Sequence, residues 1–401
     1  VTGVQTCALP ILIGAGEEDR RQHHRRNDGY GIGLEQIRRH AGAIAEDPVA
    51  ELVAVADPAP TGKALAKEMD VPLHADVQSM LETETIDGVI VSTPTELHLE
   101  PTLAALQAGK HVLVEKPIMA TLEEAERVVE KSAETGLHVL VGHHRRYYPQ
   151  VHKAREIVQS GTLGQLVAVT GQWNARKNDD YYDPDWRKKR EAGPVLSNLI
   201  HEIDTLRYIC GEVESISAEV SSSVMEIEKE DAAAMVMRFQ SGALATFVVS
   251  DQTSSPWAWE FATGETPSFP RSGQNTVRFM GTKAALDFPN LVLWHHGEDA
   301  PDWNHAMKRE EILCDLGDAY VRLVEGAEQI AGDPVGRGLG VAAPDHGLEE
   351  LGGLALGDQD PGIVGREPEF RHVAGLLGVG QLGQAGLDLG HPVGVELQRW
   401  Q

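Results

Sequence analysis

The sequence has few cysteines, few aromatic residues and a shortage of positive charge. Only three of the 401 residues are cysteines, and none forms a CxxC pair. This spacing excludes a zinc ribbon and a disulfide framework, so a cytoplasmic location is expected. The 35 Lys and Arg residues face 61 Asp and Glu residues, which gives a formal charge of −26. A surface this acidic repels phosphate backbones and anionic lipids, so nucleic acids and membrane surfaces are excluded as partners.

Long hydrophobic runs are also missing. Apolar residues make up 41% of the chain, but no run approaches the ~18 residues that are needed to cross a bilayer. A transmembrane helix is therefore not expected. The length of 401 residues is sufficient for two or three domains of roughly 150 residues each.

Both ends of the chain differ from the sequence between them. Residues 1–11, VTGVQTCALPI, resemble the translation of a sequencing-library adaptor and are interpreted as a non-native segment, because a signal peptide would need a basic start and an apolar core. Residues 336–401 contain 16 of the 41 glycines and keep neither a helical nor a strand period. We interpret this Gly-rich tail as a shifted reading frame, with a flexible extension as the alternative, and assign it no function.

Short apolar strands alternate with helices in the first part of the chain. Strands are predicted at residues 51–56, 88–91, 111–114 and 138–141, and helices at residues 64–69, 100–108 and from Thr121 onward. Thr121 and Glu124 have the spacing of a capping box at the start of a helix. Strands that alternate with helices of this length form βαβ units, so residues 12–142 are predicted to be an α/β domain with a parallel sheet.

The pattern changes near Pro149. Helices are predicted at residues 150–160 and 196–209, and strands at residues 166–173, 216–220, 233–239, 243–249, 276–280 and 291–295. Successive strands with tight connections indicate an antiparallel sheet. Residues 143–335 are therefore predicted to be an α+β domain for substrate binding and oligomerisation. Because an open sheet usually needs to be covered, a homodimer or homotetramer is expected.

Two features predict a dinucleotide cofactor. Gly14 and Gly16 supply the first two glycines of a GxGxxG turn, which brings backbone N–H groups and a helix N-terminus onto a pyrophosphate. Asp57 follows the strand at 51–56, where its carboxylate can accept hydrogen bonds from ribose hydroxyls and repel a 2′-phosphate. NAD is therefore predicted in preference to NADP, with an ordinary loop-starting Asp as the alternative. Gly14 and Asp57 are 43 residues apart, about twice the usual ~20, because residues 17–35 form an anomalous polar insertion.

Three strings follow the ends of predicted strands: VSTPTELH from Val91, VEKP from Val114 and GHHRRYYP from Gly142. Open α/β sheets bind ligands at this edge. Together with DWR from Asp185 and GPVLSNLIHEID from Gly193, these strings resemble the glucose–fructose oxidoreductase / inositol dehydrogenase / rhizopine-catabolism (Gfo/Idh/MocA) family of NAD(P)-dependent oxidoreductases. The resemblance covers about residues 37–334. It implies a Rossmann domain followed by an α+β domain with an open antiparallel sheet, and activity on sugars, polyols and related metabolites.

The resemblance also assigns the reacting groups. Lys116 matches the family's catalytic lysine, which can donate to the substrate oxygen, and His201 matches the second catalytic position, which can exchange a proton with the substrate. Many members have an Asp four residues before this histidine, where this chain has Ser197. We expect Asn198, one helical turn from His201, to bind substrate hydroxyls instead. The family's glycine fingerprint ends in a histidine that corresponds to His40, with Ile37 in place of the third glycine.

Further positions are expected at the site, with packing or surface exposure as the alternative for each. The expected cofactor-binding residues are Gly14, Gly16, Asp57, Thr93, Pro94, His98, Glu115, Lys116, Trp186 and Arg187. The expected substrate-binding residues are Arg146, Tyr147, Tyr181, Asn198 and His201, with Tyr182 as a further candidate. The histidine pairs at 23–24, 143–144 and 295–296 lack a carboxylate or cysteine at ligand spacing, so no metal is expected.

The sequence thus predicts a cytoplasmic NAD-dependent dehydrogenase or reductase that transfers hydride between nicotinamide and the CH–OH group of a sugar, polyol or sugar acid. An NAD-retaining glycosidase of the same fold is one alternative. A non-catalytic sugar or nucleotide sensor, or an inactive relative, is another, and the interrupted glycine turn favours it. Lys116 and His201 favour an enzyme. Residues 254–274 are expected to form a loop over the site that sets the substrate.

Overall fold

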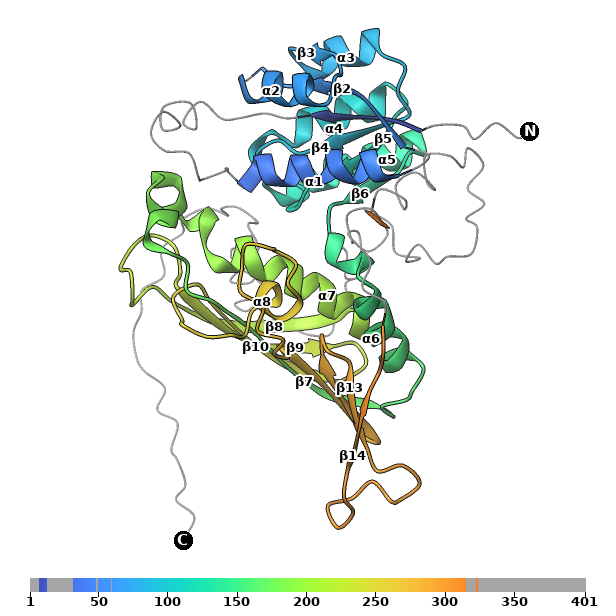
Figure 1. The fold of residues 1–401 in the computed structure, drawn as a ribbon, viewed down its shortest axis with the longest axis vertical. Coiled ribbons are helices and arrows are strands. Elements are labelled where there is room, and N and C mark those ends of the chain that lie inside the picture. Colours follow the sequence, from blue (N-terminus) through green and yellow to red (C-terminus); the bar gives the residue numbers. More distant parts are fainter. Residues whose placement is uncertain (1–6, 13–31, 48–49, 59, 315–321, 324–401) are drawn as a thin grey trace, which may run out of the picture.

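The computed structural model describes residues 7–12, 32–47, 50–58, 60–314 and 322–323, which form two domains (Figure 1). The first domain contains a six-stranded parallel sheet in the order β3-β2-β1-β4-β5-β6. Its strands are β1 (Cys7–Leu12), β2 (Ala50–Ala56), β3 (Leu73–His74), β4 (Gly88–Val91), β5 (His111–Val114) and β6 (Val139–Val141). The order reverses between β1 and β4, which is the switch point where doubly wound sheets bind dinucleotides. The predicted Rossmann-type fold is confirmed.

Helices cover both faces of this sheet (Figure 1). They are α1 (Ile32–Glu46), α2 (Pro60–Glu68), α3 (Val77–Thr83), α4 (Leu99–Gln107) and α5 (Leu122–Thr135). All four residues of β4 are buried, as expected for a strand packed on both sides. The predicted capping box of α5 is confirmed: the Glu124 N–H donates to the Thr121 hydroxyl and the Thr121 N–H donates to the Glu124 carboxylate, both at 3.2 Å.

Strand β1 moves the expected start of the first domain. Cys7–Leu12 pairs in parallel with both β2 and β4, so residues 7–11, which the sequence interpretation set apart from the first domain, belong to its sheet. Pro10 has no N–H to donate to the ladder, and the register between β1 and β2 shifts between Leu9 and Ile11, on either side of it. The non-native origin of residues 1–11 stays a prediction. Gly14, Gly16, residues 17–31 of the insertion and the Gly-rich tail lie outside the described residues.

The second domain contains an eight-stranded sheet in the order β14-β13-β12-β11-β7-β10-β9-β8. Its strands are β7 (Leu166–Asn174), β8 (Val213–Ser221), β9 (Ala232–Phe239), β10 (Leu244–Ser250), β11 (Val277–Gly281), β12 (Ala284–Phe288), β13 (Val292–His295) and β14 (Lys308–Glu311). Every neighbouring pair is antiparallel except β7 with β10. The expected antiparallel sheet is thus mixed at its centre.

Helices α6 (Pro149–Gln159), α7 (Ile200–Cys210) and α8 (Trp259–Thr263) lie on the face of this sheet toward the first domain (Figure 1). Side chains alternate along β9, so Met235, Met237 and Phe239 join the core under these helices. On the opposite face Val236, Leu244 and Val248 are 49%, 42% and 44% exposed. That face therefore presents apolar side chains with no helix of the described part over it.

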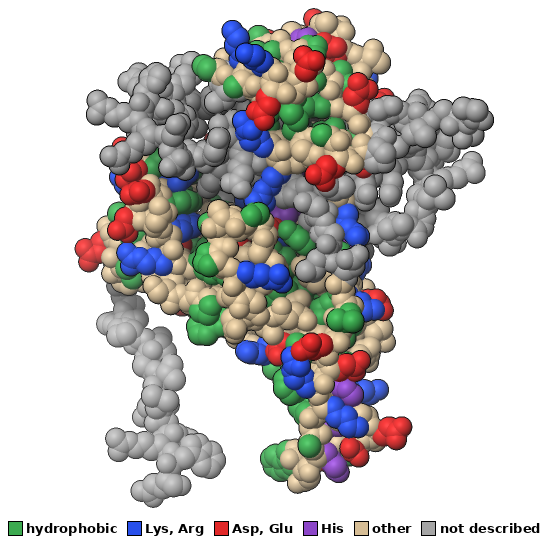
Figure 2. Space-filling view, in the orientation of Figure 1, with side chains coloured by type: hydrophobic (Ala, Val, Ile, Leu, Met, Phe, Trp, Pro, Cys, Tyr) green, Lys and Arg blue, Asp and Glu red, His purple; other side chains and the backbone are tan. Residues whose placement is uncertain are grey.

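The hairpin of β13 and β14 projects from the end of the sheet. Figure 2 shows Lys, Arg, Asp, Glu and His side chains together on it. All four residues of β14 are exposed. None of the described helices is long and apolar enough to cross a membrane.

Candidate active site

The carboxyl end of β4 offers unused hydrogen-bonding groups at the switch point of the Rossmann sheet. Ser92 Oγ and Thr93 Oγ1 are buried and have no hydrogen-bond partner among the residues that the structure describes. A buried hydroxyl without a partner is uncommon and often marks a ligand site. His98 holds this turn in place, because its ring nitrogens lie 2.8 Å from Thr93 O and 3.0 Å from Ile118 O. These residues fit a bound dinucleotide, whereas direct contact of His98 or Pro94 with a cofactor stays a prediction.

Asp57 occupies the carboxyl end of β2. It is buried, and its N–H donates to His74 O at 3.0 Å. Its side chain packs against Gly62 so closely that a Cβ at residue 62 would lie 2.2 Å from Asp57 Cβ. Glycine is therefore required there, and the carboxylate keeps a fixed place beside the first turns of α2. This position suits contact with an adenosine ribose.

Glu115, directly after β5, is ionised although it is buried. Its Oε1 lies 2.7 Å from His40 Nε2 of α1, and its Oε2 accepts the Lys116 N–H at 3.1 Å. Burial alone would raise the pKa of Glu115, but the hydrogen bond and charge of His40, with the charges of Lys116 and His144, hold it at about 2. Glu115 thus fixes the backbone of Lys116 and connects α1 to the end of β5.

Charged groups of the second domain lie close enough to Lys116 to affect its pKa. The Lys116–Pro117 peptide is cis. Burial lowers the pKa of Lys116, and the nearby Arg145 lowers it further, whereas Glu115, Glu260 and Glu265 oppose the change. A lysine whose pKa is lowered gives up its proton more readily than a solvated one, so it can donate to a substrate oxygen.

His201 on α7, the second reacting group that the sequence predicts, is buried. Burial lowers its pKa well below 6.5, and the charges of Lys116, Arg145, His144 and His143 act in the same direction. Lys116 and His201, which the sequence predicts as partners, therefore lie close enough for one charge to affect the other. His201 Nδ1 is buried and has no hydrogen-bond partner within the described part of the chain. Neutral His201 can accept a proton through its other nitrogen.

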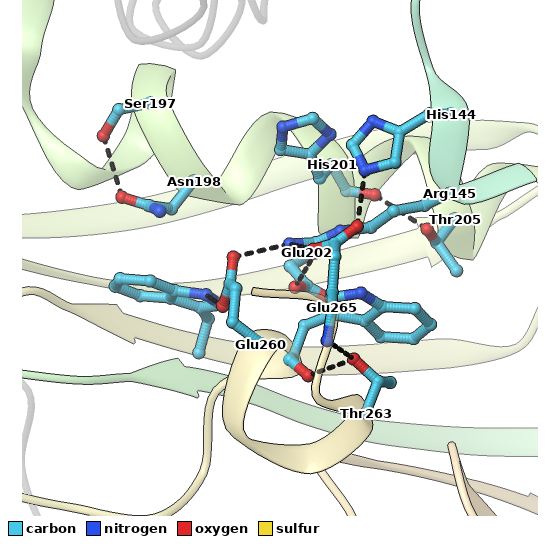
Figure 3. Close-up of polar contacts among 12 residues, drawn as sticks. His144, Arg145, Ser197, Asn198, His201, Glu202, Thr205, Glu260, Thr263 and Glu265 are labelled. Carbon is cyan, nitrogen blue, oxygen red and sulfur yellow. Dashed lines mark hydrogen bonds and ion pairs between the residues drawn. The ribbon is translucent and has the colours of Figure 1, made fainter. Parts of the chain in front are cut away.

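A buried ionic cluster supports this histidine from below (Figure 3). The rings of His144 and His201 are 5.3 Å apart, and His144 Nε2 contacts Glu265 Oε1 at 2.5 Å. Arg145 donates to Glu202 on α7 at 2.5 Å and to Glu260 on α8 at 2.7 Å. The cluster thus ties the turn after β6 to α7 and to α8, and fixes the ring of His144 against His201.

The cluster holds three carboxylates around one arginine. Burial and the negative charges of Glu260 and Glu265 raise the pKa of Glu202 to about 7, against the influence of Arg145. The pKa of Glu265 is held at about 2, because Arg145 and His144 outweigh its burial. Glu202 therefore carries a proton in a large share of molecules at neutral pH.

Two expected substrate residues have structural contacts instead. Arg146 forms a bidentate pair with Asp204, with Nε–Oδ2 at 2.9 Å and Nη2–Oδ1 at 2.6 Å. Tyr147 packs against the core of the first domain, and its burial raises its pKa. Asp204 therefore braces the site by holding Arg146. Substrate contact by Arg146 or Tyr147 stays a prediction.

Asn198 lies in a π-helical turn, η7 (Val195–Leu199), just before α7. Its Oδ1 accepts hydrogen bonds from Ser197 Oγ at 2.8 Å and from Lys177 Nζ at 3.0 Å (Figure 3 shows the first). Lys177 also lies 4.6 Å from the centre of the Tyr181 ring. The sequence interpretation missed Lys177, which lies four residues beyond the predicted strand at 166–173 in a segment without a recognised motif.

Arg187 and Trp186 lie on a short helix, η5 (Asp185–Lys188). The Arg187 guanidinium stacks 4.1 Å from the centre of the Tyr181 ring and donates to Tyr181 O at 3.0 Å, whereas Trp186 is 47% exposed. The ring of Tyr182 has a different neighbour, because Lys229 Nζ lies 5.2 Å from its centre. Tyr181 and Asn198 thus share Lys177 as a neighbour. Contact of Arg187 and Trp186 with the cofactor stays a prediction.

No group of three or more metal-ligating side chains occurs in the part of the chain that the structure describes. His143 and His144, one of the suspected pairs, separate: His143 Nε2 lies 3.8 Å from Asp204, whereas His144 contacts Glu265. Their neighbours are thus carboxylates that already bind arginines.

Comparison with known families agrees with this geometry. The description "Oxidoreductase family, NAD-binding Rossmann fold" matches residues 29–143, and the GFO/IDH/MocA C-terminal domain matches residues 151–287. Together they cover more than half of the chain. The chain belongs to the Gfo/Idh/MocA family of oxidoreductases.

Individual relatives of this Gfo/Idh/MocA chain differ in their reactions. It is 25% identical over 293 residues to 2,7-anhydro-N-acetylneuraminate hydratase of Escherichia coli, a match covering 66% of this chain and 78% of that protein. It is 34% identical over 180 residues to 1,5-anhydro-D-fructose reductase of Ensifer adhaerens, covering 43% of this chain and 52% of the reductase. The chain therefore spans only about half the length of the second relative.

A solved structure shares the fold over nearly the whole chain. The WlbA dehydrogenase of Bordetella pertussis, in complex with NADH and UDP-GlcNAcA, has a TM-score of 0.63 at 20% identity and covers 94% of this chain and 95% of its own. At this identity the likeness establishes the fold alone.

Proposed function

We propose that this protein is an NAD-dependent oxidoreductase that interconverts an alcohol and a carbonyl group on a sugar, polyol or sugar acid. The observation that carries the proposal is a buried His201 whose ring lies 5.3 Å from that of His144 and whose pKa is lowered by burial and by the nearby charge of Lys116. Nicotinamide, when bound, supplies hydride transfer to or from the substrate carbon. The reductase among the relatives and the NADH named with the WlbA structure support this chemistry.

The protein's residues handle the proton and the substrate oxygen. In the direction of oxidation, His201 accepts the hydroxyl proton while Lys116 donates a hydrogen bond to the oxygen and stabilises its developing negative charge. The steps reverse in reduction. Glu115 holds the Lys116 backbone, and Glu265 holds His144 against His201. Asn198 binds a neighbouring hydroxyl.

NAD is preferred to NADP in this proposal because of Asp57. A carboxylate at the end of β2 can accept hydrogen bonds from the ribose 2′- and 3′-hydroxyls and repels a 2′-phosphate. Gly62 leaves room for that carboxylate. Equilibrium binding of both cofactors to the wild type and to Asp57→Asn tests this preference. Equal affinity of the wild type for NAD and NADP would remove it.

Turnover by the full chain tests the reaction. The appearance of reduced nicotinamide is followed with a panel of polyols, sugars and sugar acids, for the wild type, His201→Asn and the control His152→Asn. His152 contacts Tyr208 at 2.9 Å, away from the proposed reacting groups. His201→Asn is expected to lower kcat by roughly 100-fold to 10,000-fold. Equal activity of the two variants would contradict the proton-transfer role.

A reaction without net oxidation is the second candidate, because one relative is a hydratase. To distinguish this reaction from net oxidation, products are analysed without added oxidant, with protein whose cofactor stays bound through dialysis. Such a reaction releases product while the amount of NADH does not change.

The location and assembly belong to the same proposal. The exposed Val236, Leu244 and Val248 favour a second copy over the open sheet face, as a homodimer or homotetramer. A monomer in sedimentation equilibrium would contradict this assembly. Cys210 takes part in no disulfide among the described residues, in keeping with the cytoplasmic location that we propose.

A further inference from the structure

Two cations flank one aromatic ring beside Asn198, and the proposed reaction does not use them. Lys177 Nζ donates to Asn198 Oδ1 at 3.0 Å, and its side chain is only 13% exposed. Lys177 Nζ lies 4.6 Å and Arg187 Cζ 4.1 Å from the centre of the Tyr181 ring. Tyr181 thus fixes both cations at one place.

Neither cation has a carboxylate of its own among the described residues. The nearest to Lys177 is Asp251, at 3.6 Å. Asp251 already accepts bonds from Lys229 Nζ at 2.9 and 3.1 Å, and one from Gln252 Nε2 at 3.2 Å. Two lysines therefore share one carboxylate.

Arg187 is less satisfied still. Its Nη1 donates a hydrogen bond to Tyr181 O, and its buried Nε has no hydrogen-bond partner among the described residues. No ion pair of Arg187 occurs in the described ranges. Because like charges held close together repel, and because a planar guanidinium can bind a carboxylate through two parallel bonds, this arrangement favours an added anion.

The position of these cations suits the far end of a substrate. Asn198 precedes His201 by three residues, in the π-helical turn that runs directly into α7, so about one turn of helix separates the two residues. On this turn Lys177 contacts Asn198 Oδ1 and the hydroxyl of Ser197, and neither group carries a negative charge. A sugar that reacts at His201 and reaches past Asn198 would bring its other end to Lys177.

We propose that Lys177 and Arg187 bind the carboxylate of an acidic sugar, of the uronate or aldonate class, whose alcohol carbon reacts at Lys116 and His201. This assignment rests on the proposed function and narrows its substrate class. Arg187 was also predicted to contact the cofactor pyrophosphate. The substrate carboxylate and the cofactor pyrophosphate are both anions, and the effect of Arg187→Met on NAD affinity distinguishes between them.

The test compares probes that differ by one carboxylate: D-glucuronate with D-glucose, and D-gluconate with sorbitol. Binding to the NAD-loaded protein is measured by calorimetry and turnover by kcat/KM, for the wild type, Lys177→Met, Lys177→Arg and Arg187→Met. Arg176→Met is the matched control, since Arg176 neighbours Lys177 but is exposed and paired with Asp179. NAD affinity and thermal unfolding are measured for each variant.

The acid of each pair should bind the wild type at least about tenfold more tightly than the neutral probe. Lys177→Met should lower the acid-to-neutral ratio by about 10-fold to 100-fold, mainly through KM, whereas Lys177→Arg and Arg176→Met should keep most of it. Lys177→Arg retains the charge, so it also separates loss of charge from loss of folding.

Equal binding of acid and neutral probes by the wild type would overturn the proposal. So would equal losses for both probes in Lys177→Met. If Arg187→Met weakens NAD binding and leaves the acid preference intact, the part assigned to Arg187 is overturned. Oxidation of neutral polyols without preference for acids would leave the proposed function standing and refute this inference. Acid binding that depends on Lys177 without any turnover would support the anion site and refute the proposed function.

Discussion

The pair formed by His40 and Glu115 allows a quantitative prediction. His40→Ala removes the imidazole 2.7 Å from the buried Glu115 carboxylate. The displacement of the Glu115 pKa from its ordinary 4.5 to about 2 corresponds to about 3 kcal/mol of stabilisation near neutral pH. Removing one partner of a buried pair leaves the other charge uncompensated. We therefore expect His40→Ala to lower the free energy of unfolding by about 3 kcal/mol.

The sign of the pH dependence follows from the same pKa. The folded-state pKa of Glu115 lies below its unfolded value, so its stabilisation is complete above about pH 5 and is lost as the pH falls towards 2. Because His40 makes the main contribution that lowers this pKa, the acid loss of stability should become shallower in His40→Ala. Urea unfolding between pH 3 and 8, about the range in which the protein's carboxylates titrate, measures both effects.

A second His–Glu pair provides the control. His74 Nε2 lies 2.8 Å from Glu84 Oε1 but is more exposed to solvent. His74→Ala should therefore cost less than about 1 kcal/mol. Equal destabilisation by His40→Ala and His74→Ala, or an unchanged acid profile in His40→Ala, would refute the reasoning.

Three further predictions concern α7. The pKa of Glu202 is raised from its ordinary 4.5 to about 7, so ionisation of this group destabilises the folded state as the pH rises through this range. The free energy of unfolding of Glu202→Gln, measured in urea, should therefore rise by about 2 to 3 kcal/mol relative to the wild type between pH 5 and 8. A difference between the two proteins that does not change with pH would contradict this prediction. Asp204→Asn releases the bidentate Arg146 and should lower Tm clearly, whereas Asp179→Asn at an exposed pair should not. Because the pKa of His201 lies well below 6.5, the pH profile of kcat/KM should contain no limb near pH 6.5 that belongs to His201, and a limb there that is lost in His201→Asn would contradict its neutral state.

Local patterns predicted most of the fold. The capping box at Thr121 and the alternation of strands and helices depend on neighbouring residues, and the structure confirms both. Strands β1, β3, β12 and β14 were not predicted, and the sequence explains two of these omissions. Pro10 and the adaptor-like composition hid β1, and the KREE sequence of β14 has no apolar face, so only pairing with β13 makes it a strand.

The candidate site was predicted only in part. Lys116, His201 and Asn198 follow from motifs, but the cluster around Arg145 does not. Its carboxylates are 57, 115 and 120 residues away in sequence, so no local spacing relates them. His40 was matched to the family's histidine, whereas its contact with Glu115 needed the fold to bring α1 to the end of β5.

The central strand of the second sheet has a consequence for synthesis. Both neighbours of β7, namely β10 and β11, come much later in the chain. As the protein leaves the ribosome, β7 therefore has two unpaired edges until residue 250 has emerged and one until residue 281. Contacts this distant form slowly, and unpaired edges can join those of other chains. The second domain therefore depends on protection during translation more than the first, whose inner strands have a neighbour close by in sequence.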